Sequence, residues 1–287
     1  MGADDMEQLA SARPIHERSV PILMYHSISG RASSSFADFA VPPDRFTEQV
    51  QAVREAGFRA VTISELAGMR RSGRWPTQPL VALTFDDGYR DFLSEALPVM
   101  RSAGMTATLY VTTGYVGGTS RWLASEGEAN RAMLGWSELA EVAGEGVEIG
   151  AHSATHPQMD LLSPSALRRE AATPRLELED RLSVAVQSFA YPYGYARRET
   201  RQAVRALGYD NACGVADLTS TEADDLFALP RLTVTSTLDG ETLASLLEQG
   251  NRNRARVQSA VRSRFSYALR RAGVKKRESA AYSRGLT

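Results

Sequence analysis

Residues 80–88 read LVALTFDDG, a pattern that predicts a buried strand ending in a turn. A nearly continuous apolar run ends abruptly at two carboxylates and a glycine. A short apolar run bounded by turn residues is typical of a strand that is buried on both faces. A helical pattern follows over residues 92–101 and ends near Gly104. A buried strand followed by a helix predicts a parallel sheet that is covered by helices.

The same alternation continues on both sides of this segment. Repeated strand–helix units over most of the chain fit a closed or nearly closed barrel better than an open sheet. The predicted fold is therefore α/β, a distorted (β/α) barrel of about seven parallel strands. The predicted strands cover residues 20–28, 59–63, 80–85, 107–113, 147–150, 186–191, 211–215 and 229–234. The predicted helices begin at residues 43, 65, 92, 137, 164 and 197, with Ser64 and Ser163 as N-caps for the second and fifth.

Composition narrows the class of protein. Of the 287 residues, 43% are hydrophobic and 23% are charged, which is ordinary for a globular domain. A single cysteine, Cys213, excludes an internal disulfide framework. No apolar run approaches the roughly 18 residues of a membrane span. Residues 1–20 have no apolar core of a secretory signal, so the expected location is cytoplasmic.

Charge is distributed unevenly along the chain. Residues 252–287 carry eleven Arg or Lys residues against one acidic residue, Glu278, whereas the preceding body is acidic. Val257, Val261 and Phe265 recur every four residues, which predicts a basic amphipathic helix. Such a helix either packs on the barrel or attaches peripherally to an anionic membrane surface. The acidic body argues against nucleic acid as a partner.

Polar side chains stand at the ends of the predicted strands, where a (β/α) barrel places its chemistry. Asp86 and Asp87 follow the strand 80–85, and His152 and His156 follow the strand 147–150. His26 closes the first strand. The His-x3-His spacing is that of metal ligands, and imidazole suits zinc and similar ions. Taken singly, each motif is equally an ordinary turn or a hydrogen-bonded histidine, but their common position favours one site.

A further strand end carries Tyr191-Pro192-Tyr193-Gly194. Proline and glycine hold a backbone turn there, and a freed backbone N–H in such a turn can donate to an oxyanion. The plainer interpretation is a turn with aromatic packing.

Together, these motifs resemble the polysaccharide deacetylase family, also called the NodB-homology or carbohydrate esterase family 4 domain. The resemblance covers about residues 20–235 and rests on TFDDG at 84–88, HSATHP at 152–157 and YPYG at 191–194. The opening PILMYH at 21–26 resembles the subgroup that de-N-acetylates poly-β-1,6-N-acetylglucosamine. A NodB-like barrel is the fold that this resemblance implies.

The resemblance also implies a set of roles. Asp87, His152 and His156 would hold one divalent metal ion, Zn²⁺ or else Co²⁺ or Ni²⁺, which polarises the acetamide carbonyl and lowers the pKa of water. Asp86 would be the general base, and the backbone N–H of Tyr193 would donate to the oxyanion.

Departures from the family pattern lead to two hypotheses. Many members have an arginine at the position of Tyr191, and many have a late histidine where this chain reads Leu229-Pro230-Arg231. We expect Arg231 to take the place of the missing arginine and orient Asp86. We expect His26 to take the place of the late histidine as the general acid that protonates the leaving amine.

Substrate contacts are expected at Tyr191, at Pro192 and at Leu229, which would line the pocket for the acetyl methyl group. The predicted domains are a flexible leader over 1–19, the catalytic domain over 20–240 and the basic helical tail over 241–287.

The predicted function is metal-dependent removal of N-acetyl groups from N-acetylglucosamine-type amino sugars in a polysaccharide or glycan precursor. Three alternatives stay open. The first is an amidohydrolase or deformylase that acts on a small non-sugar amide. The second is a non-haem iron oxygenase, because two histidines and one carboxylate are also its ligand set. The third is a glycan-binding module without catalytic activity.

Overall fold

The computed structural model describes residues 19–249. Residues 1–18 of the predicted leader and the basic segment 252–287 lie outside the described residues. The two alternatives for that segment, packing on the barrel or membrane attachment, therefore stay predictions. The strands are β1 (Ser19–Val20), β2 (Ile22–Tyr25), β3 (Ser27–Ile28), β4 (Ala40–Val41), β5 (Arg59–Ala60), β6 (Leu80–Phe85), β7 (Thr108–Val111), β8 (Glu148–Ala151), β9 (Ser188–Ala190), β10 (Asn211–Cys213), β11 (Ser220–Thr221) and β12 (Leu232–Thr233). The α-helices are α2 (Pro43–Glu55), α3 (Ile63–Ser72), α4 (Leu97–Ser102), α5 (Trp136–Gly144), α6 (Pro164–Leu182), α7 (Arg198–Ala206) and α8 (Gly240–Gln249).

One sheet organises the described part of the chain. Its strands run in the order β10-β9-β8-β7-β6-β2-β12, and β5 pairs with the first residues of β6. Every neighbouring pair in this sheet is parallel. A parallel bridge between Cys213 and Leu229 joins the β10 edge to the segment that leads into β12. The predicted distorted (β/α) barrel of about seven parallel strands is confirmed.

Alternation along the strands separates two buried layers. On β6, Val81, Leu83 and Phe85 join the large hydrophobic core between the sheet and the helices. Ala82 faces the opposite side, where it joins a smaller cluster that includes Tyr110. Because Asp86 continues the series of Ala82 and Thr84, it lies on the inner face of the barrel.

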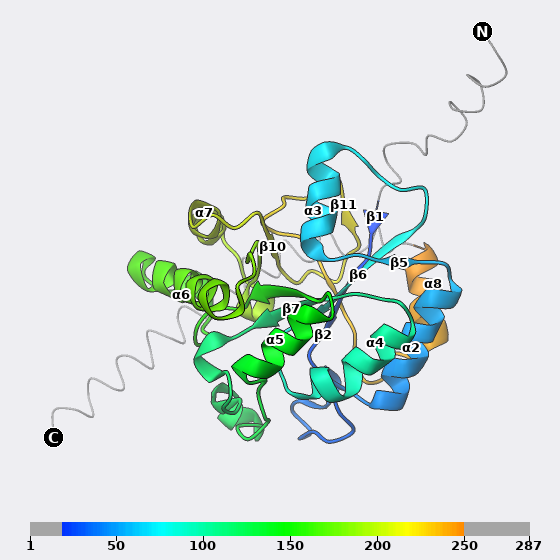
Figure 1. Ribbon diagram of the computed structural model, residues 1–287, viewed down its shortest axis with the longest axis horizontal. Helices are drawn as coiled ribbons and strands as arrows, with labels where there is room; N and C mark the ends of the chain where they lie inside the picture. The colour runs from blue at the N-terminus through cyan, green and yellow to red at the C-terminus, as the bar shows by residue number, and fades with distance from the viewer. Residues whose placement is uncertain (1–18, 250–287) are drawn as a thin grey trace, which may run out of the picture.

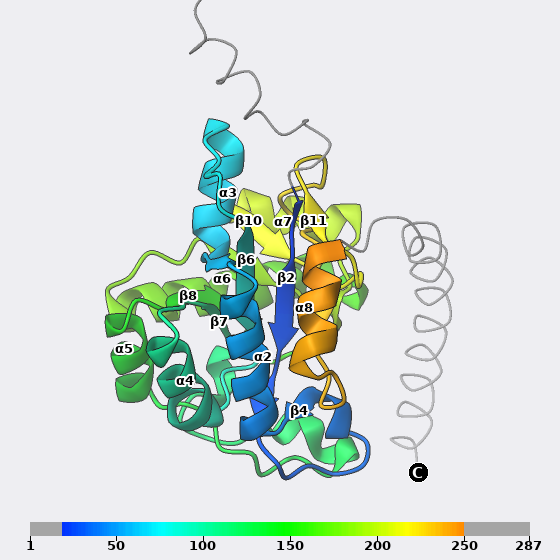
Figure 2. The same ribbon diagram turned by 90° about the vertical axis from the view of Figure 1, so that its right-hand side faces the viewer.

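The helices surround the sheet, as Figure 1 shows. Helices α2 and α8 pack against each other and lie side by side next to β2 (Figure 2). Within residues 19–249, no helix is both long and apolar enough to cross a membrane. Helix α8 begins at Gly240, so the described start of the predicted tail is a helix that packs on the barrel.

Two helix starts, those of α3 and α6, are capped by a hydroxyl side chain. Ser163 accepts a hydrogen bond from the backbone N–H of Ala166, as expected of the N-cap of α6. The second helix begins earlier than predicted, because Thr62 and not Ser64 is its N-cap. Thr62 and Glu65 form a reciprocal capping box. The Ser64 hydroxyl instead donates to the carboxylate of Glu148 on β8.

Candidate active site and metal centre

The site begins at the end of β6, where the chain carries two adjacent carboxylates, Asp86 and Asp87. Asp86 and Asp87 are both buried, with 3% of each exposed to solvent. Asp87 has a φ of 78°, in the left-handed region that residues other than glycine seldom adopt. This backbone turn lets Asp87 face the same site as Asp86, although neighbours on a regular strand point to opposite faces.

Two histidines reach Asp87 from the end of β8. The Nε2 atoms of His152 and His156 lie 3.5 Å and 3.2 Å from Asp87 Oδ1. The ligand atoms of the three residues all lie within 4.8 Å of one another. His152 Nδ1 makes a hydrogen bond of 2.8 Å with the backbone oxygen of Ala190. With Nδ1–H donating there, Nε2 keeps its lone pair toward Asp87.

These donor atoms fit a divalent metal ion. Two imidazole nitrogens and one carboxylate oxygen are a ligand set that suits zinc and similar ions. Asp87 Oδ1 is buried and has no hydrogen-bond donor among the residues described. Burial, which outweighs the neighbouring carboxylates, lowers the pKa of His152 to about 4. Burial would raise the pKa of Asp87, but the two histidines hold it below its ordinary value. Both residues therefore favour the unprotonated forms that bind metal.

Asp86 is held by a buried arginine. Arg231 Nη1 and Nη2 donate to Asp86 Oδ1 and Oδ2 at 2.6 Å and 2.7 Å. Burial alone would raise the pKa of Asp86, but the Arg231 guanidinium and His152 keep it below its ordinary value. The contact predicted between Arg231 and Asp86 is present, in a two-bond geometry that orients the carboxylate.

His26 lies at the end of β2, on the same rim of the barrel. Its ring packs edge-on against Phe39, with 5.0 Å between the ring centroids. Burial lowers the pKa of His26, whereas the charges of Asp87 and Asp86 act in the opposite direction. The negative charges of both carboxylates therefore act on the His26 ring.

The Tyr-Pro-Tyr-Gly turn contributes Tyr193 to the site. Tyr193 also has a left-handed backbone, with φ of 61°, and its side chain is half-exposed. Its ring lies against that of His156, with 4.8 Å between the centroids. Asp87, Ser153, His156 and Tyr193 all have positive φ. Backbone strain of this kind gathers at functional sites.

Three predicted substrate contacts are buried. Tyr191 is fully buried among core residues, and its hydroxyl donates to the backbone oxygen of Phe227. The reason is alternation along β9, which turns Ala190 inward and Tyr191 toward the helices. A substrate contact through the Tyr191 ring would require this core to open. Leu229 is likewise fully buried in the inner cluster, and Pro192 is buried at the start of its turn.

Sequence reasoning missed an aromatic group that lies beside the histidines. Trp122 stacks on His156, with centroids 5.2 Å apart and planes 29° apart. The ring centroid of Trp122 lies 4.6 Å from that of Tyr115 and 6.3 Å from that of Tyr89, which stacks on the indole. Trp122 belongs to a short 3-10 segment without helical or strand periodicity, so no local pattern could indicate its place.

Comparisons with known proteins find similar deacetylases. The family model described as polysaccharide deacetylase matches residues 74–212. The Bacillus subtilis protein YxkH is 26% identical over 229 residues, which cover 80% of this chain and 76% of that protein. The poly-β-1,6-N-acetyl-D-glucosamine N-deacetylase of Staphylococcus aureus (strain MRSA252) is 20% identical over 214 residues, covering 71% of this chain and 70% of that enzyme.

Among solved structures, the Streptococcus pyogenes deacetylase PplD in complex with acetate superposes with a TM-score of 0.70. It is 26% identical, and the alignment covers 80% of this chain and 98% of that one. The sequence motifs, the barrel fold and the group formed by Asp87, His152 and His156 therefore all point to the same family. Over residues 74–212 the chain matches the polysaccharide deacetylase family, and its relative YxkH and its solved neighbour PplD carry the same deacetylase description.

Proposed function

We propose that this chain is a divalent-metal-dependent hydrolase that removes N-acetyl groups from N-acetylglucosamine-type amino sugars in a polysaccharide or glycan precursor. The observation that carries the proposal is the pairing of two differently held carboxylates. Asp87 faces His152 and His156, whereas Asp86 faces Arg231. This pairing supports a cation-binding role for Asp87 and a proton-transfer role for Asp86.

The metal site would consist of Asp87, His152 and His156. A divalent ion held there supplies Lewis-acid chemistry, which polarises an amide carbonyl and lowers the pKa of water. All other steps belong to the residues of this chain.

Asp86 acts as the general base that takes the proton of the attacking water. Arg231 keeps this carboxylate ionised and fixes its orientation through two hydrogen bonds. The backbone N–H of Tyr193 donates to the oxyanion that develops as the carbonyl carbon becomes tetrahedral. His26 protonates the departing amine, which cannot leave as an anion. Substrate contacts at Pro192 and Leu229 remain predictions.

The experiment is acetate release from N-acetylglucosamine oligomers by the full chain. We would strip the protein of metal, assay it, and then restore Zn²⁺, Co²⁺ or Ni²⁺ in turn. The expected result is release that depends on added metal and is abolished in Asp86→Asn. Because Asp86→Asn keeps the proposed metal ligands, it should still bind the metal.

Other outcomes would redirect the proposal. Binding of one metal ion per chain without acetate release would indicate a different amide, and small non-sugar amides would be assayed next. Turnover that requires oxygen would support the oxygenase alternative. Failure to bind any divalent metal would leave a glycan-binding module.

A further inference from the structure

We propose that Trp122 is a positioning residue for His156, and that its stacked ring takes the place of the hydrogen bond that usually orients a metal-binding imidazole. This inference rests on the proposed function, because it requires His156 to be a metal ligand.

The two histidines are held in different ways. His152 is oriented by the hydrogen bond between its Nδ1 and the backbone oxygen of Ala190, at 2.8 Å. His156 Nδ1 is buried and has no hydrogen-bond partner among residues 19–249. Metal-binding histidines almost always donate their second ring nitrogen to a carboxylate, a carbonyl or a water, which fixes the plane of the ring. Among residues 19–249, the contacts that can fix the plane of His156 are therefore those of neighbouring rings.

Aromatic rings surround His156 on several sides. Trp122 stacks over it at 5.2 Å and 29°. The ring of Tyr193 meets the His156 ring edge-on, with 4.8 Å between centroids and 66° between planes. The ring of His152 does the same, with 5.0 Å and 62°. Rotation of the imidazole would break the parallel contact with Trp122. An imidazole that donates its lone pair to a cation becomes electron-poor, so the electron-rich indole face should favour the metal-bound state.

Trp122 is itself firmly held. Tyr115 and Tyr89 cover it at 4.6 Å and 6.3 Å between centroids. Its indole Nε1 is buried and, within the described part of the chain, lacks a hydrogen-bond acceptor. Packing rather than hydrogen bonding therefore sets the position of the indole.

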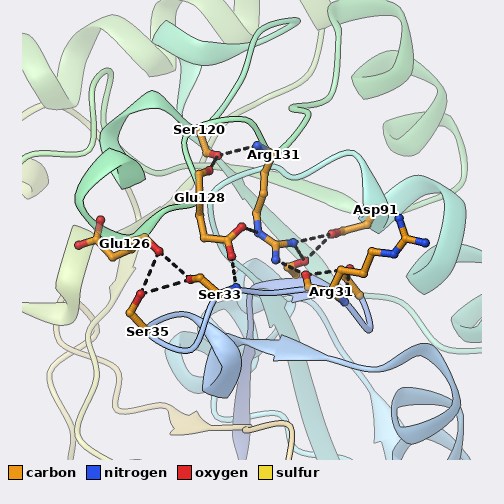
Figure 3. A network of polar contacts seen from close by, with 10 residues as sticks. Arg31, Ser33, Ser35, Asp91, Ser120, Glu126, Glu128 and Arg131 are labelled. Carbon is orange, nitrogen blue, oxygen red and sulfur yellow. Dashed lines mark hydrogen bonds and ion pairs between the residues drawn. The ribbon is translucent and has the colours of Figure 1, made fainter.

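A polar network anchors the segment that carries Trp122 (Figure 3). The hydroxyls of Ser33 and Ser35 donate to the backbone oxygen of Glu126 at 2.6 Å and 2.9 Å. Arg131 Nε lies 2.8 Å from Glu128 Oε2, and Arg131 Nη1 donates to Ser27 Oγ at 2.7 Å. The network ties residues 120–131 to β3 and to the loop that follows it. A rigid support of this kind is what a positioning residue requires.

The test is the Zn²⁺ affinity of the metal-stripped full chain, measured by competition with a chromophoric chelator. Loss of a residue that orients a metal ligand typically weakens affinity by about 10- to 100-fold. We expect Trp122→Ala and Trp122→Leu to bind Zn²⁺ at least about 10-fold more weakly than the wild type. Trp122→Phe should keep near wild-type affinity, because it retains an aromatic face. The matched control is Trp136→Ala, whose indole faces Arg181 on α6 and should leave Zn²⁺ affinity unchanged.

A spectroscopic readout tests the proximity separately. The chain has three tryptophans, Trp75, Trp122 and Trp136. Co²⁺ or Ni²⁺ bound beside His156 should quench the fluorescence of Trp122. We expect quenching in the wild type and in Trp136→Phe, and its loss in Trp122→Phe.

Each outcome separates the inference from the proposed function. If the wild type binds no metal, the proposed function fails. If the wild type binds Zn²⁺ and folded Trp122→Ala and Trp122→Leu bind it equally well, this inference alone is overturned. Should Trp122→Ala not fold, the comparison of Trp122→Leu with Trp122→Phe decides, because equal affinities would reject a role for the aromatic face.

Discussion

Arg231 and Asp86 stand 145 residues apart in the chain, yet their side chains form two buried hydrogen bonds of 2.6 Å and 2.7 Å. Arg231 is fully buried, and its remaining donors reach the backbone oxygen of Gly214 at 3.0 Å and the hydroxyl of Thr84 at 3.2 Å. Each of the three guanidinium nitrogens thus donates at least one hydrogen bond, and these bonds fix the orientation of the Asp86 carboxylate.

Removal of Arg231 should therefore affect both stability and activity. Arg231→Met leaves Asp86 buried without its countercharge, which typically costs about 3–5 kcal/mol. Arg231→Lys keeps the charge but loses the two-bond geometry, so we expect acetate release to fall although stability partly recovers. Urea unfolding of the metal-free chain and acetate release measure the two effects.

The double variant Asp86→Asn/Arg231→Met is the control for this pair. In the Asp86→Asn variant, Arg231→Met should lower the free energy of unfolding by less than it does in the wild type. The reason is that no buried carboxylate charge is then left without its partner. Equal stability of the wild type and Arg231→Met would show that the pair does not stabilise the fold.

His26 should matter only where the leaving group needs a proton. We expect His26→Ala to slow amide hydrolysis by about 10²- to 10⁴-fold, the usual contribution of a general acid. Hydrolysis of 4-nitrophenyl acetate should change little, because 4-nitrophenolate leaves without protonation. Steady-state rates on both substrates test this, and an equal loss on both would assign His26 a different role.

Gly194 should not tolerate a side chain. Its φ is 72°, and an added Cβ would lie 2.6 Å from Val215 Cβ and 2.8 Å from the Val215 nitrogen. Left-handed strain and overlap together should destabilise Gly194→Ala by about 2 kcal/mol or more. Gly68→Ala is the matched control, since Gly68 lies inside α3 with nothing within 4 Å of the added atom.

In a helix interior, alanine is favoured over glycine by roughly 0.5–1 kcal/mol, so Gly68→Ala should stabilise the protein. Denaturant unfolding of both variants gives the comparison. A Gly194→Ala protein as stable as the wild type would mean that the turn can relax.

Asp91 should make stability depend on pH. Burial raises the pKa of Asp91 above its ordinary value of 3.8, although hydrogen bonds such as that from Ser27 oppose the shift. As pH rises above about 4, the unfolded chain releases this proton before the folded chain does, so the free energy of unfolding falls. Asp91→Asn removes this contribution, and its stability relative to the wild type should increase as pH rises from about 4.

Urea unfolding of the metal-free proteins across pH 4–7 measures the difference for Asp91. A stability difference that does not change with pH would contradict the raised pKa.

Sequence patterns determined the elements and the chemistry at their ends. The apolar run of β6 spans Leu80–Phe85, as predicted, and Ser163 caps α6. The candidate site lies at strand ends, because parallel strands bring their carboxyl ends to one rim of a barrel. The grouping of Asp87, His152 and His156 follows from that rule.

Which side chains meet across distant segments depends on the tertiary structure. Tyr191 does not face the interior of the barrel, because it packs in the core between the sheet and the helices, and the Ser64 hydroxyl donates to Glu148 from another strand. The stacking of Trp122 on His156 joins two loops that share no pattern. Periodicity and turn chemistry are local properties of the chain, whereas these contacts exist only once the barrel has formed and packed its loops.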